Sequence, residues 1–361
     1  RYALVLLLLF ALFIFFFALK YHAIEDNSMG NPELDFYVGR AKEVGQSILP
    51  RDEARPILYH LLGGGAGKLL GGNYFRGSQL VSLLSAITFV YATYLLARKL
   101  SSEKLALVVM AATAMNTEII REGVRASSDM LFSALTILTL YQLIKCCWHK
   151  PLVKQRKTDF VLLGLFFGLA LFTRYTALLL LPLILYGFFI SKRNVKQAIL
   201  IFALTGFTVI LPQLWVNYHN FGSPFFSENW KNMGIHYFGI QGDDWNKFYN
   251  SYSKDEFRQQ LIHNPLAVPK ATILEIGKFG VILLPKLLGE SFFLGAIFIL
   301  VAFLYYLRRV FTKLKEVKNL AFIFVFLNVI GVGAVFSIMP RTVLPIIPIL
   351  YLAIFSYLAM F

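Results

Sequence analysis

The chain has 361 residues, of which 57% are hydrophobic and only 15% are charged, with a formal net charge of +15. So little charge leaves too little polar surface to solvate a compact globule of this length, which excludes an ordinary soluble enzyme. About ten apolar stretches recur along the chain, each near the length needed to cross a hydrocarbon layer as a helix. We therefore expect an all-α, multi-pass integral membrane protein in which residues 1–361 form a single membrane domain.

The predicted spans follow these apolar stretches. They cover residues 3–19, 78–97, 104–120, 128–147, 159–174, 175–191, 197–216, 287–307, 319–338 and 343–361. Each should be a helix, because lipid offers no hydrogen-bonding partner to an exposed backbone. A cleaved signal peptide is the alternative for the first stretch, but no clear small-x-small cleavage motif follows it, which favours a membrane anchor.

The positive charge lies in alternate connections between the spans. The connections at 98–104, 145–157, 192–196 and 308–318 are short and basic, so the positive-inside rule places them in the cytoplasm. The connections at 20–77, 121–128 and 217–286 balance acids against bases and are expected outside. Because the basic residues are explained by the orientation of the chain in the membrane, we expect membrane lipids as partners and no nucleic acid. We expect the protein in the plasma (inner) membrane.

The first outer loop, residues 20–77, contains two helical patterns. Apolar residues at three- and four-residue spacing predict an amphipathic surface helix over 32–48 and a second helix over 57–70. Asp35 falls in the first turn of the former, where helix capping is the alternative to a chemical role. The glycine-rich run 63–68 is not interpreted as a phosphate-binding loop, because Leu69 replaces the metal-binding Ser or Thr and no strand precedes it. Close helix packing explains these glycines more simply.

Four more charged residues lie near the outer ends of spans. Asp129 starts the span 128–147, and Arg125 precedes it in a cluster of acids and arginines for which local ion pairing is the alternative reading. Arg174 and Arg341 are wedged between apolar runs on the outer side, where neither serves the positive-inside signal. An anion bound between helices would account for both arginines, since guanidinium matches phosphate oxygens in a fork geometry. Snorkelling to lipid headgroups is the alternative.

The outer segment 217–286 is rich in aromatic residues among Asn and Gly. Flat aromatic faces beside amides suit sugar rings, and they suit the membrane interface equally well. Its histidines, His219, His236 and His263, lack the spacing of metal ligands, so no zinc site is expected. Cys146 and Cys147, at a predicted cytoplasmic end, are interpreted as unreactive interfacial thiols, with palmitoylation as the alternative.

Several short motifs are spread over most of the chain. They are Asp35-Phe36-Tyr37, Arg55-Pro56-Ile57-Leu58-Tyr59, Ala126-Ser127-Ser128-Asp129-Met130-Leu131-Phe132, Thr173-Arg174-Tyr175, Asn217-Tyr218 with Phe221-Gly222-Ser223-Pro224-Phe225, and Pro340-Arg341 with Leu344-Pro345 and Pro348. In these motifs the chain resembles the polyprenyl-phosphate-dependent membrane glycosyltransferases of the GT-C fold, in particular the protein O-mannosyltransferase and aminoarabinose transferase group. It departs from them in three places: Asp35 is a single acid where a pair is common, Arg55 replaces the first of two prolines, and Arg174 stands where lysine is frequent.

The resemblance implies transfer of a sugar from a polyprenyl-phosphate donor to a lipid, glycan or protein acceptor on the outer side of the membrane. Asp35 would take the proton of the acceptor hydroxyl, and Asp129 would orient the acceptor or share that role. Arg174 and Arg341 would stabilise the leaving phosphate. The remaining candidates for substrate binding are Tyr37, Arg55, Arg125 and Asn217. One base without a second nucleophile predicts inversion. No metal ligand is assigned and no cofactor is certain, with a divalent cation left open.

Two other classes of protein fit the same helices. A secondary transporter would show two related halves, and no such symmetry is visible in the sequence. A non-catalytic membrane assembly subunit would keep the helices without needing acids and cations to converge. The prediction that separates the enzyme from both is that Asp35, Asp129, Arg174 and Arg341 meet in one outward cavity.

Overall fold

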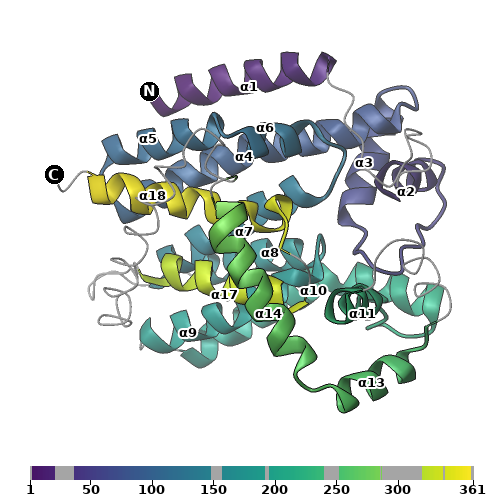
Figure 1. The fold of residues 1–361 in the computed structure, drawn as a ribbon. Coiled ribbons are helices and arrows are strands. Elements are labelled where there is room, and N and C mark those ends of the chain that lie inside the picture. The colour runs from purple at the N-terminus through teal and green to yellow at the C-terminus, as the bar shows by residue number, and fades with distance from the viewer. Residues whose placement is uncertain are drawn as a thin grey trace.

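The computed structural model describes residues 2–20, 36–147, 157–191, 195–239, 252–284, 286, 319–335 and 338–358. Within these ranges every regular element is a helix, as the composition predicts (Figure 1). The α-helices are α1 (Tyr2–Lys20), α2 (Phe36–Gly45), α3 (Leu58–Leu69), α4 (Tyr74–Leu100), α5 (Glu103–Ala114), α6 (Thr117–Val124), α7 (Asp129–Cys147), α8 (Lys157–Leu171), α9 (Leu181–Ser191), α10 (Val195–Phe221), α11 (Asn229–Phe238), α13 (Lys254–His263), α14 (Ala267–Lys278), α17 (Leu320–Val335) and α18 (Ile347–Leu358). The shorter elements are the 3-10 helices η2 (Tyr175–Leu180) and η5 (Pro340–Ile346) and the π-helical turn η3 (Phe279–Leu283).

In the described part of the chain, five helical segments are long and apolar enough to cross a membrane. They are α1, α4, α7, α10 and the continuous stretch of η5 and α18, and shorter apolar helices lie at 175–190 and 323–335. The chain is therefore an all-helical integral membrane protein. The total of about ten spans remains a prediction, because the segment 287–307 lies outside the described residues.

The predicted span 104–120 is divided into two helices. The side-chain oxygen of Asn116 accepts the backbone N–H groups of Glu118 and Ile119 at 3.0 and 3.2 Å, so Asn116 caps the start of α6. Hydropathy alone joins these residues into one apolar stretch, whereas the cap ends α5 and turns the chain toward Asp129. This turn matters for function because it leads directly into a predicted site residue.

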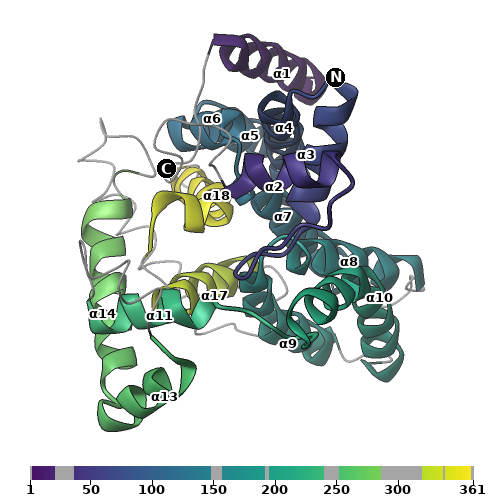
Figure 2. The same ribbon diagram turned by 90° about the vertical axis from the view of Figure 1, so that its right-hand side faces the viewer.

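The helices pack around α4 and α7. Helix α4 contacts α1, α3, α5, α6 and α7, and α7 contacts α8, α9 and η5. Helix α1 lies at the edge of the molecule, while α13 and α14 project on another side (Figure 2). The two thiols at the end of α7, Cys146 and Cys147, are free and buried, which agrees with their interpretation as unreactive.

The glycine-rich run lies inside α3, where it allows close contact with α2 and α4. A Cβ atom on Gly77 of α4 would lie 2.2 Å from the backbone nitrogen of Gly67, and one on Gly64 would lie 2.6 Å from the carbonyl oxygen of Ala41. Such distances leave no room for a side chain. The packing interpretation is confirmed for Gly63, Gly64 and Gly67, whereas a Cβ atom on Gly65 would have nothing within 4 Å. The two predicted surface helices of the first outer loop correspond to α2 and α3, although residues 32–35 lie outside the described residues.

Helices α2 and α3 of the first predicted outer segment and α11 and α13 of the last lie at one end of the bundle, on the right of Figure 1. The loop 46–57 is tied there by backbone and amide contacts. The N–H of Glu228 donates to Glu53 O at 2.7 Å, and the side-chain amide of Asn229 donates to Ala54 O at 2.8 Å. These bonds join parts of the chain more than 170 residues apart and fix the loop that carries Arg55.

Candidate active site

Asp129 and Arg174 form an ion pair at the predicted outer end of the bundle. Asp129 is the first residue of α7, and its side chain is 1% exposed. Arg174 follows the end of α8, at the N-cap of η2, with its side chain 27% exposed, and its Nη1 donates to Asp129 Oδ1. The structure thus brings together a predicted acid and a predicted phosphate-binding cation that lie 45 residues apart.

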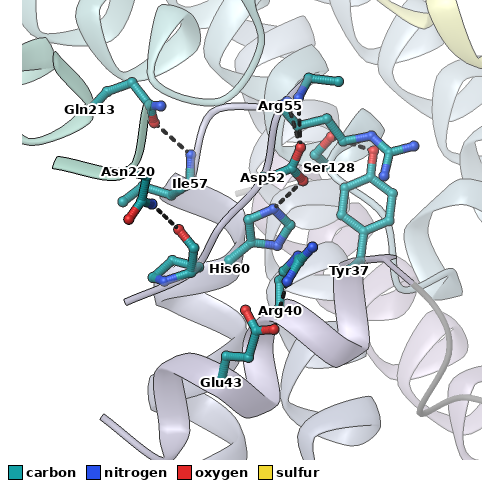
Figure 3. A network of polar contacts seen from close by, with 12 residues as sticks. Tyr37, Arg40, Glu43, Asp52, Arg55, Ile57, His60, Ser128, Gln213 and Asn220 are labelled. Carbon is teal, nitrogen blue, oxygen red and sulfur yellow. Dashed lines mark hydrogen bonds and ion pairs between the residues drawn. The ribbon is translucent and has the colours of Figure 1, made fainter. Parts of the chain in front are cut away.

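A second set of contacts extends from this pair to the first outer loop. The hydroxyl of Tyr37, on α2, lies 3.0 Å from Oγ of Ser128, the residue before Asp129. The guanidinium carbon of Arg55 lies 4.6 Å from the centre of the Tyr37 ring, which is within the range of a cation–π interaction. Arg55, Tyr37 and Ser128 are seen together in Figure 3. Four predicted site residues, Tyr37, Arg55, Asp129 and Arg174, therefore lie in one connected cluster with Ser128.

A buried acid holds the backbone at Arg55. Oδ1 of Asp52 accepts the N–H of Ala54 at 3.0 Å and that of Arg55 at 2.8 Å, and Oδ2 lies 3.2 Å from Nε2 of His60 on α3. Burial alone would raise the pKa of the Asp52 carboxyl, but the hydrogen bond and charge of His60, the charge of Arg55 and the N–H of Ala54 outweigh it and lower the pKa to about 2. Asp52 is thus an ionised carboxylate that fixes the loop.

Polar groups of α3 and α4 support the turn before Asp129. Nε2 of Gln79 donates to Val124 O at 2.8 Å, and the hydroxyl of Ser82 donates to Ser127 O at 3.1 Å. The hydroxyl of Tyr59 lies 2.8 Å from Ser82 Oγ. Since Val124 is the last residue of α6 and Ser127 lies in the turn before α7, their carbonyl groups need partners from outside a helix, and these side chains supply them. The backbone that presents Ser128 and Asp129 is therefore held by α4.

Arg125 follows the last residue of α6 and is buried beside an acid of that helix. Its Nη1 donates to Oε1 of Glu122 at 3.3 Å, and Glu122 is 0% exposed. Arg121 pairs with Glu118 at 2.5 Å and with Glu122 at 3.3 Å. Local ion pairing, the alternative reading of this cluster, is what the described geometry shows, and substrate binding by Arg125 remains a prediction.

Asn217 and Arg341 lie in the two later segments. The side-chain amide of Asn217 donates to Pro224 O at 3.0 Å and to Phe226 O at 3.1 Å, which fixes the turn after α10. Arg341 is the second residue of η5, an element that packs against α6 and α7. Their roles in substrate binding remain predictions. Asp35, the predicted base, lies outside the described residues.

Comparison with known proteins decides the fold. Residues 55–216 match the family model of the dolichyl-phosphate-mannose-protein mannosyltransferases. The structure is similar to that of ArnT from Cupriavidus metallidurans bound to undecaprenyl phosphate, with a TM-score of 0.63 and 14% identity over 99% of this chain and 60% of that chain. It is also similar to the archaeal oligosaccharyltransferase AglB from Archaeoglobus fulgidus in complex with an inhibitory peptide and a dolichol-phosphate, with a TM-score of 0.59 and 11% identity over 100% of this chain and 50% of that chain.

The chain has the GT-C fold. The resemblance expected from its motifs is confirmed. This GT-C chain spans 60% of the length of ArnT and half of that of AglB. No curated protein sequence matches it. The segment that matches the mannosyltransferase model contains Arg55, Arg125, Ser128, Asp129 and Arg174, so every member of the connected cluster except Tyr37 falls within it.

Sequence reasoning missed three residues of this candidate site: Asp52, His60 and Ser128. Asp52 lies in the charged run Arg51-Asp52-Glu53-Ala54-Arg55, which is typical of a solvated loop, and His60 is a single histidine in an apolar helix. One signal was available, because an Asp shortly before a helix often accepts backbone N–H groups two and three residues later. No group of three or more His, Cys, Asp or Glu side chains in the described ranges could hold a metal ion.

Proposed function

We propose that this chain is a membrane glycosyltransferase that moves a sugar from a polyprenyl-phosphate donor to an acceptor on the extracytoplasmic face, with inversion at the sugar. The observation that carries the proposal is the connected cluster of Arg55, Tyr37, Ser128, Asp129 and Arg174. It lies in a GT-C fold, largely within the segment that matches the mannosyltransferase family, and it joins residues of the predicted outer connections 20–77 and 121–128 to Asp129 and Arg174 at the ends of predicted spans.

The two arginines of the cluster suit a lipid phosphate. Negative charge grows on the phosphate as the glycosidic bond breaks, and fixed cations stabilise that charge. The Arg174 guanidinium is oriented by the buried carboxylate of Asp129, and that of Arg55 is oriented by the ring of Tyr37. Orientation before binding reduces the ordering cost when the phosphate arrives. Arg341 is assigned to the same phosphate, because η5 packs against the helix that carries Asp129.

The acceptor hydroxyl needs a base, since it is a weak nucleophile while protonated. We assign this role to Asp35, on the strength of its place one residue before α2, the helix that carries Tyr37. Asp129 is assigned to orientation, because its carboxylate is already engaged with Arg174. In this scheme the acceptor oxygen attacks the anomeric carbon as the bond to the phosphate oxygen breaks, and the proton passes to Asp35. A single displacement of this kind inverts the anomeric centre.

The lipids bound in two similar structures support a polyprenyl phosphate as the donor carrier. ArnT was solved with undecaprenyl phosphate and AglB with a dolichol-phosphate, so two proteins of this fold bind a polyprenyl phosphate. The sugar and the acceptor are not identified by these likenesses, and the acceptor class is left as lipid, glycan or protein.

The test is consumption of lipid-linked sugar by the purified protein in detergent or nanodiscs. A panel of polyprenyl-phosphate sugars is offered with lipid, glycan and peptide acceptors, with and without a divalent metal. We expect release of the lipid phosphate with at least one donor, and loss of that release in Arg174→Ala. A folded protein that binds undecaprenyl phosphate but consumes no donor in any arm contradicts the enzyme and favours a non-catalytic membrane subunit.

A further inference from the structure

The pair of Asp52 and His60 has no part in the chemistry proposed above, yet it is almost completely buried. The side chain of Asp52 is 6% exposed and that of His60 is 0% exposed. Burying two polar groups of this kind is costly unless they make good hydrogen bonds. The pair is therefore expected to serve a purpose that apolar side chains could not.

The carboxylate of Asp52 joins a helix to a loop. One oxygen accepts the N–H of Arg55 at 2.8 Å, and the other lies 3.2 Å from Nε2 of His60, which is fixed within α3. The far side of the same loop is held by the N–H of Glu228 on Glu53 O at 2.7 Å. The backbone of Arg55 is thus set between α3 on one side and the segment before α11 on the other.

His60 also touches the aromatic ring on which Arg55 lies. The rings of Tyr37 and His60 are 5.8 Å apart between centroids, and the rings of Tyr37 and Tyr59 are 5.4 Å apart in an edge-on contact. The guanidinium of Arg55 lies 4.6 Å from the centre of the Tyr37 ring. The contacts therefore form a closed ring, which runs from Asp52 to His60, from His60 to Tyr37, from Tyr37 to Arg55 and from Arg55 back to Asp52. Figure 3 shows these four residues from close by. The backbone of Arg55 is held by Asp52, and its side chain is held by the ring of Tyr37.

We propose that Asp52 and His60 are positioning residues that set the guanidinium of Arg55 for the phosphate of the lipid-linked donor. Neither residue touches the substrate in this scheme. The inference rests on the proposed function, in which Arg55 binds that phosphate. If the pair were lost, the loop would keep its contacts to the segment before α11, but the backbone of Arg55 and the ring of Tyr37 would each lose a supporting contact. Because misplacement of a binding group by about 1 Å costs as much as about 100-fold in rate, both the binding of the donor phosphate and the rate of transfer should fall.

The experiment compares the donor KM, the kcat and the affinity for undecaprenyl phosphate among variants of the pair. His60→Leu and Asp52→Ala remove the contact between Asp52 and His60, and they should lower kcat/KM for the donor about 10- to 100-fold and weaken the binding of undecaprenyl phosphate. Asp52→Asn and His60→Gln keep a polar group in place and should recover most of the affinity. Glu53→Gln is the matched control, because Glu53 is the next residue and its side chain is 44% exposed, so its values should equal those of the original protein.

Failure of this inference differs from failure of the proposed function. If the original protein binds undecaprenyl phosphate without transferring sugar, the proposed reaction is wrong, and weaker binding by His60→Leu still supports the positioning role. If folded His60→Leu and Asp52→Ala bind undecaprenyl phosphate as tightly as the Glu53→Gln control, the positioning role is overturned. Should Asp52→Ala fail to fold, the comparison of His60→Leu with His60→Gln decides in the same way, since only the former should lose affinity.

Discussion

Removal of Arg174 is expected to destabilise the protein strongly, because it leaves a buried charge without its counter-ion. The Asp129 side chain is 1% exposed and pairs with Arg174. Loss of one partner of a buried ion pair costs about 3 to 5 kcal/mol, mostly from the uncompensated charge. The Arg174 side chain is 27% exposed, so water already reaches part of the pair, and we expect Arg174→Ala to cost about 3 kcal/mol, at the lower end of that range.

The reverse change should cost less. Asp129→Asn removes the buried charge itself and leaves an arginine that can extend toward headgroups and water, so a loss of about 1 kcal/mol is expected. In the double variant Arg174→Ala with Asp129→Asn there is no buried charge to strand. Its cost should therefore be smaller than the sum of the two single costs, by about 2 kcal/mol.

The assay is unfolding by denaturant titration in mixed micelles, with all three variants in the same detergent. Single costs that add to the double cost within about 0.5 kcal/mol would refute the ion pair as a stabilising contact. The same variants separate stability from donor binding. If folded Arg174→Ala binds the donor with unchanged affinity, Arg174 does not bind the donor phosphate, and the alternative that its side chain snorkels to lipid headgroups is favoured.

Three further outcomes are expected. Asp35→Asn should lower the rate of transfer by about 10²- to 10⁴-fold in single-turnover assays, and near-normal transfer would remove Asp35 from the mechanism. Since the pKa of Asp52 is about 2, below the ordinary 3.8, its carboxylate stabilises the fold above about pH 4. This contribution of about 2 kcal/mol should be lost as the pH falls from about 4 to 2, and Asp52→Asn should flatten that part of a stability profile; an unchanged slope contradicts the assignment. Gly77→Ala should destabilise by about 1 to 3 kcal/mol, because the new Cβ meets the backbone of α3. Gly65→Ala, where nothing lies within 4 Å, should not, and equal melting temperatures of the two variants would refute the close packing.

The sequence was informative about the fold wherever an apolar stretch was continuous. The length and hydropathy of the apolar stretches predicted α4, α7 and α10 within a few residues. In lipid, a helix is needed to satisfy the hydrogen bonds of the backbone. They failed at 104–120, where Asn116 ends one helix and caps the next. A hydropathy window averages over such a cap, since one side chain contributes little to the mean while its hydrogen bonds decide the chain direction.

The site was predictable to the extent that charge at membrane depth demands a partner. Asp129 was chosen for this reason, whereas Arg174 was chosen because it serves no positive-inside signal and could bind an anion. The two residues pair with one another. Asp52 and His60 were not chosen, because nothing in a linear sequence shows that a charged loop folds back onto a buried histidine. Burial of that loop depends on contacts with the segment before α11, about 175 residues away.

Polar residues at the predicted outer end of the bundle have two tasks, and the structure separates them for Asn217 and Arg174. Segments that leave a helix there have backbone groups that neither water nor lipid fully satisfies, so side chains must supply the bonds. Asn217 does so for the turn that carries Pro224 and Phe226. Arg174 instead extends its charge to a carboxylate from another helix while remaining partly exposed. Because the sequence context of both residues is a polar group at the end of an apolar run, only the partners distinguish them. A change at Asn217 should therefore act first on the order of the turn, whereas a change at Arg174 should act on the charge of the site.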